Sequence, residues 1–127
     1  MRQKWIAVLL AGFLVEGAAC AGRHTSKTSP SEETVVVVRN GNWLDAVVYA
    51  VRGATRIRLG SVTGLNTTTF KFPTNYSPDG TFQLLVDPIG SSTVYMSNDF
   101  VVTPGQHVEL SIAPALSMST VAVWSSR

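Results

Sequence analysis

The chain has 127 residues, a length that favours a single domain. Apolar residues make up 45% of it and charged residues 14%, a balance that argues against a disordered chain and against a charge-driven nucleic-acid binder. Removing Arg2, Lys4 and Glu16 from the ten basic and eight acidic residues leaves eight and seven, so half of the net charge of +2 comes from the N-terminal segment and the rest of the chain is nearly neutral.

Residues 1–19 have the features of an export signal. Residues 1–4 are positively charged, residues 5–15 form an apolar run, and residues 17–19 are small. The run is shorter than the ~20 residues that span a bilayer, so it predicts a signal-peptide helix. The only cysteine, Cys20, follows directly. This arrangement resembles the lipobox of bacterial lipoproteins, which implies cleavage before Cys20 and a lipid on its thiol.

The position three residues before Cys20 leaves an alternative open. Lipoboxes usually carry a large aliphatic residue there, and this chain has Gly17. Ordinary signal-peptidase cleavage after Ala19 or Ala21 gives a secreted or periplasmic soluble protein instead. We favour the lipid-anchored form, because a single unpaired thiol gives a secreted domain no disulfide. By the same resemblance, Ala21 in place of aspartate implies the outer membrane.

Residues 20–33 predict a flexible linker after the leader. Beyond Ala21 the stretch to Glu33 has no large apolar side chain and is rich in Ser and Thr. Such a segment buries too little apolar surface to fold. The folded domain is therefore expected at residues 34–127.

The rest of the chain is a series of short segments that favour strands, separated by turn residues. The expected strands lie at residues 34–39, 45–52, 55–62, 67–72, 81–86, 106–112 and 119–124, with shorter candidates at 93–96 and 100–102. Residues 45–62 predict a hairpin around Gly53. Without a convincing amphipathic helix, the pattern predicts an all-β fold, an antiparallel β-sandwich of about seven to eight strands.

Residues 106–112 show the clearest alternation of period two. It places Val108, Leu110 and Ile112 inward and the residues between them outward. The sequence of residues 44–49, 69–73, 82–86 and 100–112 resembles the carboxypeptidase-regulatory or transthyretin-like sandwich family. That resemblance implies an Ig-like sandwich serving as an accessory or adhesion module.

The resemblance does not extend to the family's hydroxyisourate hydrolases. Those enzymes use histidines, an arginine and a Tyr-Arg-Gly-Ser tail, whereas this chain ends Trp-Ser-Ser-Arg and has one histidine, His107, beyond residue 33. His107 falls on the polar side of its strand, and the acidic residues stand singly, so no catalytic pair is predicted. We expect no enzyme activity, no cofactor and no metal; a hydrolase with an unrecognised site is a third hypothesis.

Two groups of side chains are candidates for binding. Arg56 and Arg58 share one face of a strand, and Arg52 ends its hairpin partner, so three guanidinium groups are expected to cluster. Trp43 and Tyr49 are aromatic residues suited to stacking or to anchoring a partner. The leading hypothesis is a non-enzymatic envelope lipoprotein with a protein partner. The alternative is a carbohydrate- or anion-binding module.

Overall fold

The computed structural model describes residues 34–72 and 79–125. The predicted leader, Cys20 and linker lie outside these residues. Within them, no helix is long and apolar enough to cross a membrane.

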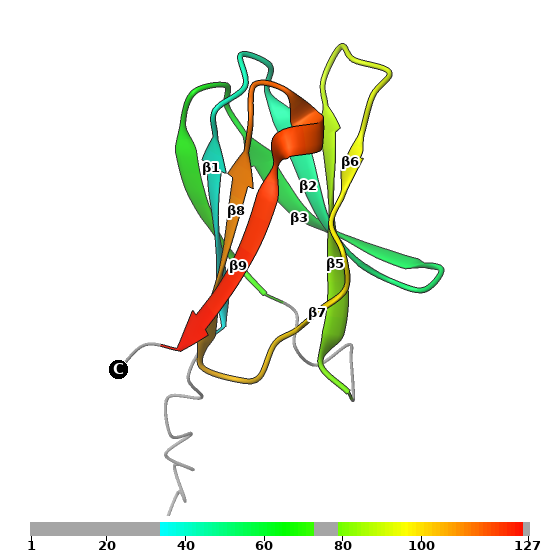
Figure 1. The fold of residues 1–127 in the computed structure, drawn as a ribbon, viewed down its shortest axis with the longest axis vertical. Coiled ribbons are helices and arrows are strands. Elements are labelled where there is room, and N and C mark those ends of the chain that lie inside the picture. Colours follow the sequence, from blue (N-terminus) through cyan, green and yellow to red (C-terminus); the bar gives the residue numbers. More distant parts are fainter. Residues whose placement is uncertain (1–33, 73–78, 126–127) are drawn as a thin grey trace, which may run out of the picture.

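The described chain is an all-β sandwich, as the sequence predicted (Figure 1). One sheet has the strand order β4-β1-β8-β9, and the other has the order β3-β2-β5-β6, with β7 paired to β5. The bounds are β1 Val35–Asn40, β2 Ala46–Arg52, β3 Thr55–Val62, β4 Thr67–Lys71, β5 Thr81–Pro88, β6 Tyr95–Met96, β7 Phe100–Val101, β8 Gln106–Ile112 and β9 Thr120–Ser125. A 3₁₀ turn, η2, spans Leu116–Met118.

One strand pair departs from the antiparallel prediction. β1 runs parallel to β8, with Val36 beside Val108 and Val38 beside Leu110. Both strands run upward in Figure 1, and they are joined through the other sheet rather than by a hairpin. A parallel pair needs such a long connection, and the alternation of side chains within a strand does not reveal it.

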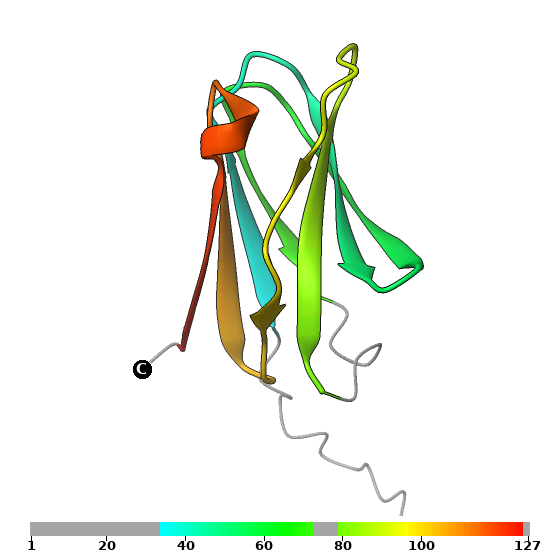
Figure 2. The same cartoon turned by 45° about the vertical axis from the view of Figure 1, so that its right-hand side comes forward.

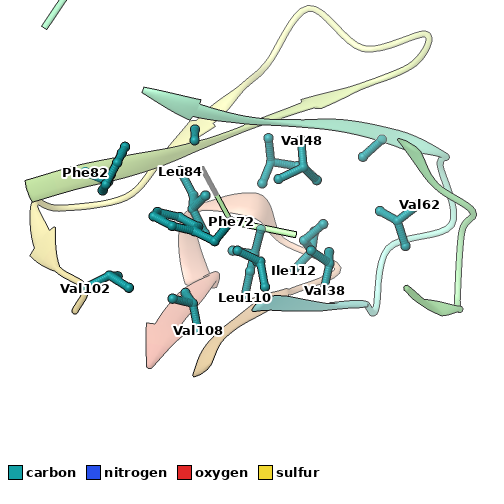
Figure 3. Close-up of a cluster of buried hydrophobic side chains, with 14 residues drawn as sticks. Val38, Val48, Val62, Phe72, Phe82, Leu84, Val102, Val108, Leu110 and Ile112 are labelled. Atoms are coloured by element: carbon teal, nitrogen blue, oxygen red, sulfur yellow. The ribbon is translucent and has the colours of Figure 1, made fainter. Parts of the chain in front are cut away.

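The core fills the space between the two sheets (Figure 3). Val108, Leu110 and Ile112 point inward as predicted, and all three are buried. Phe72 packs edge-on against Phe82, with ring centroids 4.5 Å apart. These rings and the β-branched residues of β1, β2 and β5 bury the apolar surface that stabilises the domain.

A bulge in the β2–β3 hairpin determines which side chains of β3 face outward. The register moves from Val48 opposite Gly60 to Tyr49 opposite Arg58, so Leu59 is an extra residue. Gly60 therefore turns to the core face, where a Cβ would lie 2.4 Å from the Phe70 ring.

Candidate functional site

Four loops meet at one end of the sandwich. They are residues 41–45, 63–66, 89–94 and 113–119, which follow β1, β3, β5 and β8. Figures 1 and 2 show them together at the top, opposite the end where β1 begins. We call these four segments the upper loops.

The upper loops carry most of the exposed large apolar side chains. Of nine such residues in the described chain, six lie in these loops, which hold about a quarter of the described residues. The six are Trp43, Leu44, Leu65, Ile89, Val94 and Met118. Trp43 is 78% exposed and Met118 71% exposed. Scattered exposed apolar residues are ordinary, so it is their concentration at one end that makes the upper loops a candidate contact surface.

The loop between β1 and β2 is bonded through its backbone to two of its neighbours and to the end of β8. The Leu65 N–H donates to the Asn42 carbonyl (3.0 Å), and the Ile89 N–H donates to the Asp45 carbonyl (2.8 Å). The Gly41 N–H donates to the carbonyl of Ile112, the last residue of β8 (2.8 Å). The exposed side chains therefore stand on a framework that is already tied together.

Side chains from the same loop complete the framework. The buried Asn40 amide donates to the carbonyls of Leu44 (2.9 Å) and Thr63 (3.2 Å) and accepts from the Asn42 N–H (2.9 Å). Asn42 Nδ2 donates to the Pro114 carbonyl (2.9 Å), which ties this loop to the one after β8. A surface held this way loses little conformational entropy when it binds, which favours affinity.

Asp45 braces the loop after β3. Its carboxylate accepts the Gly64 N–H at 2.9 Å. A Cβ at Gly64 would lie 2.1 Å from the Trp43 carbonyl oxygen, so the two backbones approach as closely as only glycine permits. The contact holds the backbone of Trp43 in place while its indole points to solvent.

Leu65 adopts a backbone conformation that costs energy. Its φ is 59°, and it is the only residue other than glycine with positive φ in the described ranges. The left-handed conformation costs an L residue about 1–2 kcal/mol. The Leu65 side chain is 59% exposed, so burial within this chain returns little of that cost. Backbone strain of this kind concentrates at functional sites.

The upper loops are uncharged apart from one carboxylate, and their exposed apolar side chains lie among Asn, Ser and Thr residues. They contain no lysine or arginine, and their only charged residue is Asp45. Exposed Trp, Leu, Ile, Val and Met side chains suit apolar contact, and these loops offer no cationic side chain to phosphate or sulfate.

The structure splits the predicted arginine cluster. Arg56 and Arg58 share the outer face with Tyr49, and the Arg56 guanidinium lies 5.0 Å from the centroid of the Tyr49 ring. Arg52 pairs with Thr55 and falls on the opposite face, where its Nε lies 4.0 Å from Asp79 Oδ1. The prediction of three clustered guanidinium groups is therefore wrong, because side chains alternate and the cluster needed Arg52 on the other side of the strand.

Trp43 stands apart from these arginines. It precedes β2, whereas Arg56 pairs with Val51 near the far end of that strand. The sequence therefore identified one residue of the upper loops and gave no sign that the other five exposed side chains join it. The spacing of Asn40, Asn42 and Asp45 was the available signal, since side chains of this type bond to loop backbones.

Two further polar residues, His107 and Ser97, make contacts within the domain. The His107 ring stacks on Trp124, with centroids 5.9 Å apart. The Ser97 hydroxyl donates to the Asn98 carbonyl and accepts from the Leu84 N–H, both at 2.9 Å. No group of three metal-ligating side chains occurs in the ranges 34–72 and 79–125.

The comparisons with known proteins add no family to this geometry. No protein-family model matches the chain, and no curated protein matches it.

Proposed function

We propose that the chain is a non-enzymatic lipoprotein of the bacterial envelope whose β-sandwich binds a protein partner through the upper loops. The observation that carries the proposal is the concentration of exposed apolar side chains on a hydrogen-bonded loop framework. Rigid aromatic and aliphatic anchors at the centre of an interface supply most of the binding free energy.

The position of the upper loops supports a protein partner over a lipid surface. β1 starts at the opposite end of the sandwich, so the linker that carries Cys20 joins the domain there. The six residues of β1 separate the two ends by about 20 Å. An anchor at one end leaves the upper loops free to meet another protein. They also lack the basic residues that attract anionic lipid.

The partner is tested by capture of the full chain from native membranes. Wild type, Trp43→Ser and Val101→Ser are crosslinked in cells, solubilised in mild detergent and compared. Val101 is a matched control, because it is 56% exposed but lies in β7, outside the upper loops. We expect one protein to be held by wild type and Val101→Ser and lost with Trp43→Ser. Equal capture by all three contradicts the proposal, and capture of lipid alone indicates a membrane surface instead.

The anchor is tested separately with a labelled fatty-acid analogue. We expect wild type to take up the label and Cys20→Ser to take up none. We further propose that the protein resides at the outer membrane, which fractionation of the labelled membranes checks. An unlabelled wild-type protein indicates ordinary signal-peptidase cleavage and a soluble periplasmic or secreted form.

A second candidate function is anion or glycan binding on the outer face of the β2–β3 hairpin. The observation that favours it is the grouping of Arg56, Arg58 and Tyr49 on one face. Retention on an anionic glycan that is lost in the double variant Arg56→Ser, Arg58→Ser supports this alternative. Retention that is absent in wild type, or unchanged in the variant, excludes it.

A further inference from the structure

β9 differs from the other strands at the edges of the two sheets. β3 carries Arg56, Arg58 and a bulge, β4 carries Lys71, and β6 and β7 have only two residues each. Charges, bulges and short length are the devices that keep edge strands from pairing with other chains. β9 has none of them: its six residues include no charge and no proline, and its register with β8 is continuous.

The open edge of β9 is suited to a second copy of the same strand. When a strand pairs antiparallel with its own copy about a two-fold axis, any charge on it is set against charges of the same sign. Residues Thr120–Ser125 escape this penalty because none is charged. Figure 2 shows β9 at the outer side of its sheet, with no described strand beyond it.

We propose that β9 pairs antiparallel with β9 of a second copy, so that two four-stranded sheets join into one, with Ala122 of each copy facing Ala122 of the other. The proposal does not rest on the partner-binding role of the upper loops. Antiparallel pairing directs the upper loops of the two copies to opposite ends.

The faces of β9 select this register. Val121 and Val123 lie beside Leu110 and Val108 and therefore face the core, whereas Ala122 and Trp124 face outward. Residues opposite one another across two strands share a face, so the two-fold axis must pass through a residue pair rather than between residues. An axis at Ala122 sets Val121 against Val123 and leaves the small Ala122 between the two Trp124 rings. An axis at Val123 pairs the same number of residues but sets Val121 against the polar Ser125 instead of Val123.

A pocket beside β9 supports the same register. It has a volume of about 260 Å³ and lies between the start of β9 and the segment from β6 to β7. Its lining combines Tyr95, Phe100 and Val121 with the polar residues Ser97, Asn98, Asp99, Ser119 and Thr120. In the proposed register Val123 of the second copy faces Val121. Its side chain therefore approaches the pocket, where it covers apolar surface that the single chain leaves open.

The register is tested by disulfide formation in the full chain, with Cys20→Ser as the common background so that only the introduced thiol reacts. Ala122→Cys places the two thiols directly opposite, within reach of a disulfide. Thr120→Cys is the matched control, because in this register the two Cα atoms at position 120 are offset by about four residues, or ~13 Å. We expect about tenfold more linked dimer from Ala122→Cys on non-reducing gels. Equal yields, or none from Ala122→Cys, overturn the register.

The association itself is tested by light scattering of the full chain. Ala122→Lys puts two like charges on the two-fold axis, while within one chain it places the ammonium next to Glu109, the partner of Ala122 on β8. We expect it to weaken dimerisation about fivefold or more. Thr69→Lys adds the same charge at the opposite edge of the sheet and is expected to leave the dimer intact. A monomer at all concentrations overturns the proposal, as does a dimer that Trp43→Ser abolishes and Ala122→Lys does not affect.

Discussion

Buried polar side chains hold loops at both ends of the sandwich, but among the described residues most of the exposed large apolar side chains lie at the upper end. A buried polar side chain stands at each end of β1: Asn40 at the upper end and Thr34 at the lower. Thr34 Oγ1 donates to the Thr103 carbonyl (3.3 Å) and accepts from the Gly105 N–H (3.1 Å), much as Asn40 bonds to the upper loops. The turn residues of the lower end that the structure describes, 79–80 and 102–105, hold no exposed large apolar side chain.

The comparison shows that the hydrogen bonds fixing a loop backbone are independent of the side chains that the loop exposes to solvent. Hydrogen bonds from buried polar groups to loop backbones serve the stability of the domain at both ends. Exposed Trp, Leu and Met side chains do not add to that stability, and the left-handed Leu65 reduces it. In the proposed function, the framework of the upper loops therefore serves folding and their exposed side chains serve binding.

The largest expected loss of stability comes from removing the Asn40 amide. Asn40→Ala leaves the carbonyls of Leu44 and Thr63 and the N–H of Asn42 without this partner. We expect the free energy of unfolding to fall by about 2–3 kcal/mol, measured by denaturant titration. Thr34→Val at the lower end is the matched change and is expected to cost about 1–2 kcal/mol. A loss below about 0.5 kcal/mol for Asn40→Ala would contradict the claim that the Asn40 amide holds the upper loops together.

The next largest loss of stability is expected from disturbing the contact between Gly64 and the Trp43 backbone. Gly64→Ala inserts a methyl group 2.1 Å from a carbonyl oxygen, and we expect a loss of about 2 kcal/mol. Gly53→Ala is the control, because nothing lies within 4 Å of its Cβ position and only its φ of 54° opposes the change. We expect that control to cost about 1 kcal/mol, measured in the same titrations. Equal losses of stability for the two variants would mean that the loops carrying Gly64 and Trp43 move apart at little energetic cost.

Leu65→Asn is expected to stabilise the domain, in contrast to the variants at Asn40 and Gly64. Asparagine tolerates the left-handed conformation better than leucine does, so we expect the unfolding free energy to rise by about 0.5–1 kcal/mol. The same variant removes an exposed apolar contact, so capture of the partner is expected to fall. A variant that is both less stable and fully able to bind refutes the division between framework and side chains.

The smallest effect on stability is expected from the exposed side chains themselves. Trp43→Ser and Met118→Ser remove groups that are mostly in solvent, so the unfolding free energy should change by no more than about 0.5 kcal/mol. The melting temperature of each variant checks this. A large loss for Trp43→Ser shows that the indole packs within the domain and weakens its assignment to binding.

The sequence predicted the individual strands well because alternation is a local property. The predicted bounds of β3 and β8 agree with the structure, and β2 begins one residue later than expected. The predicted end of the fifth strand was two residues short, because Asp87 and Pro88 resemble turn residues. As the last residue of the strand, Pro88 lies beyond the pairing with β6, which covers Leu85 and Val86.

Features that depend on neighbours distant in the sequence were not predicted. The parallel pairing of β1 with β8 requires knowing which strands adjoin, and the bulge at Leu59 requires knowing the register. The side of the sheet that Arg52 occupies could have been predicted, because the two-residue turn after it sets Arg52 opposite Thr55 and Val51 opposite Arg56. Asp45 was identified only as an isolated carboxylate, and its bond to Gly64 exists because two loops 19 residues apart meet.

Photocrosslinking from single positions tests most directly the claim that the upper loops bind a protein. A photoreactive amino acid is placed in the full chain at position 43, 65 or 118, or at position 101 as the control outside these loops, and the cells are irradiated. The account predicts one shared protein adduct from the three upper positions and none from position 101. Adducts of similar yield from all four positions, or no protein adduct from the upper three, would contradict it.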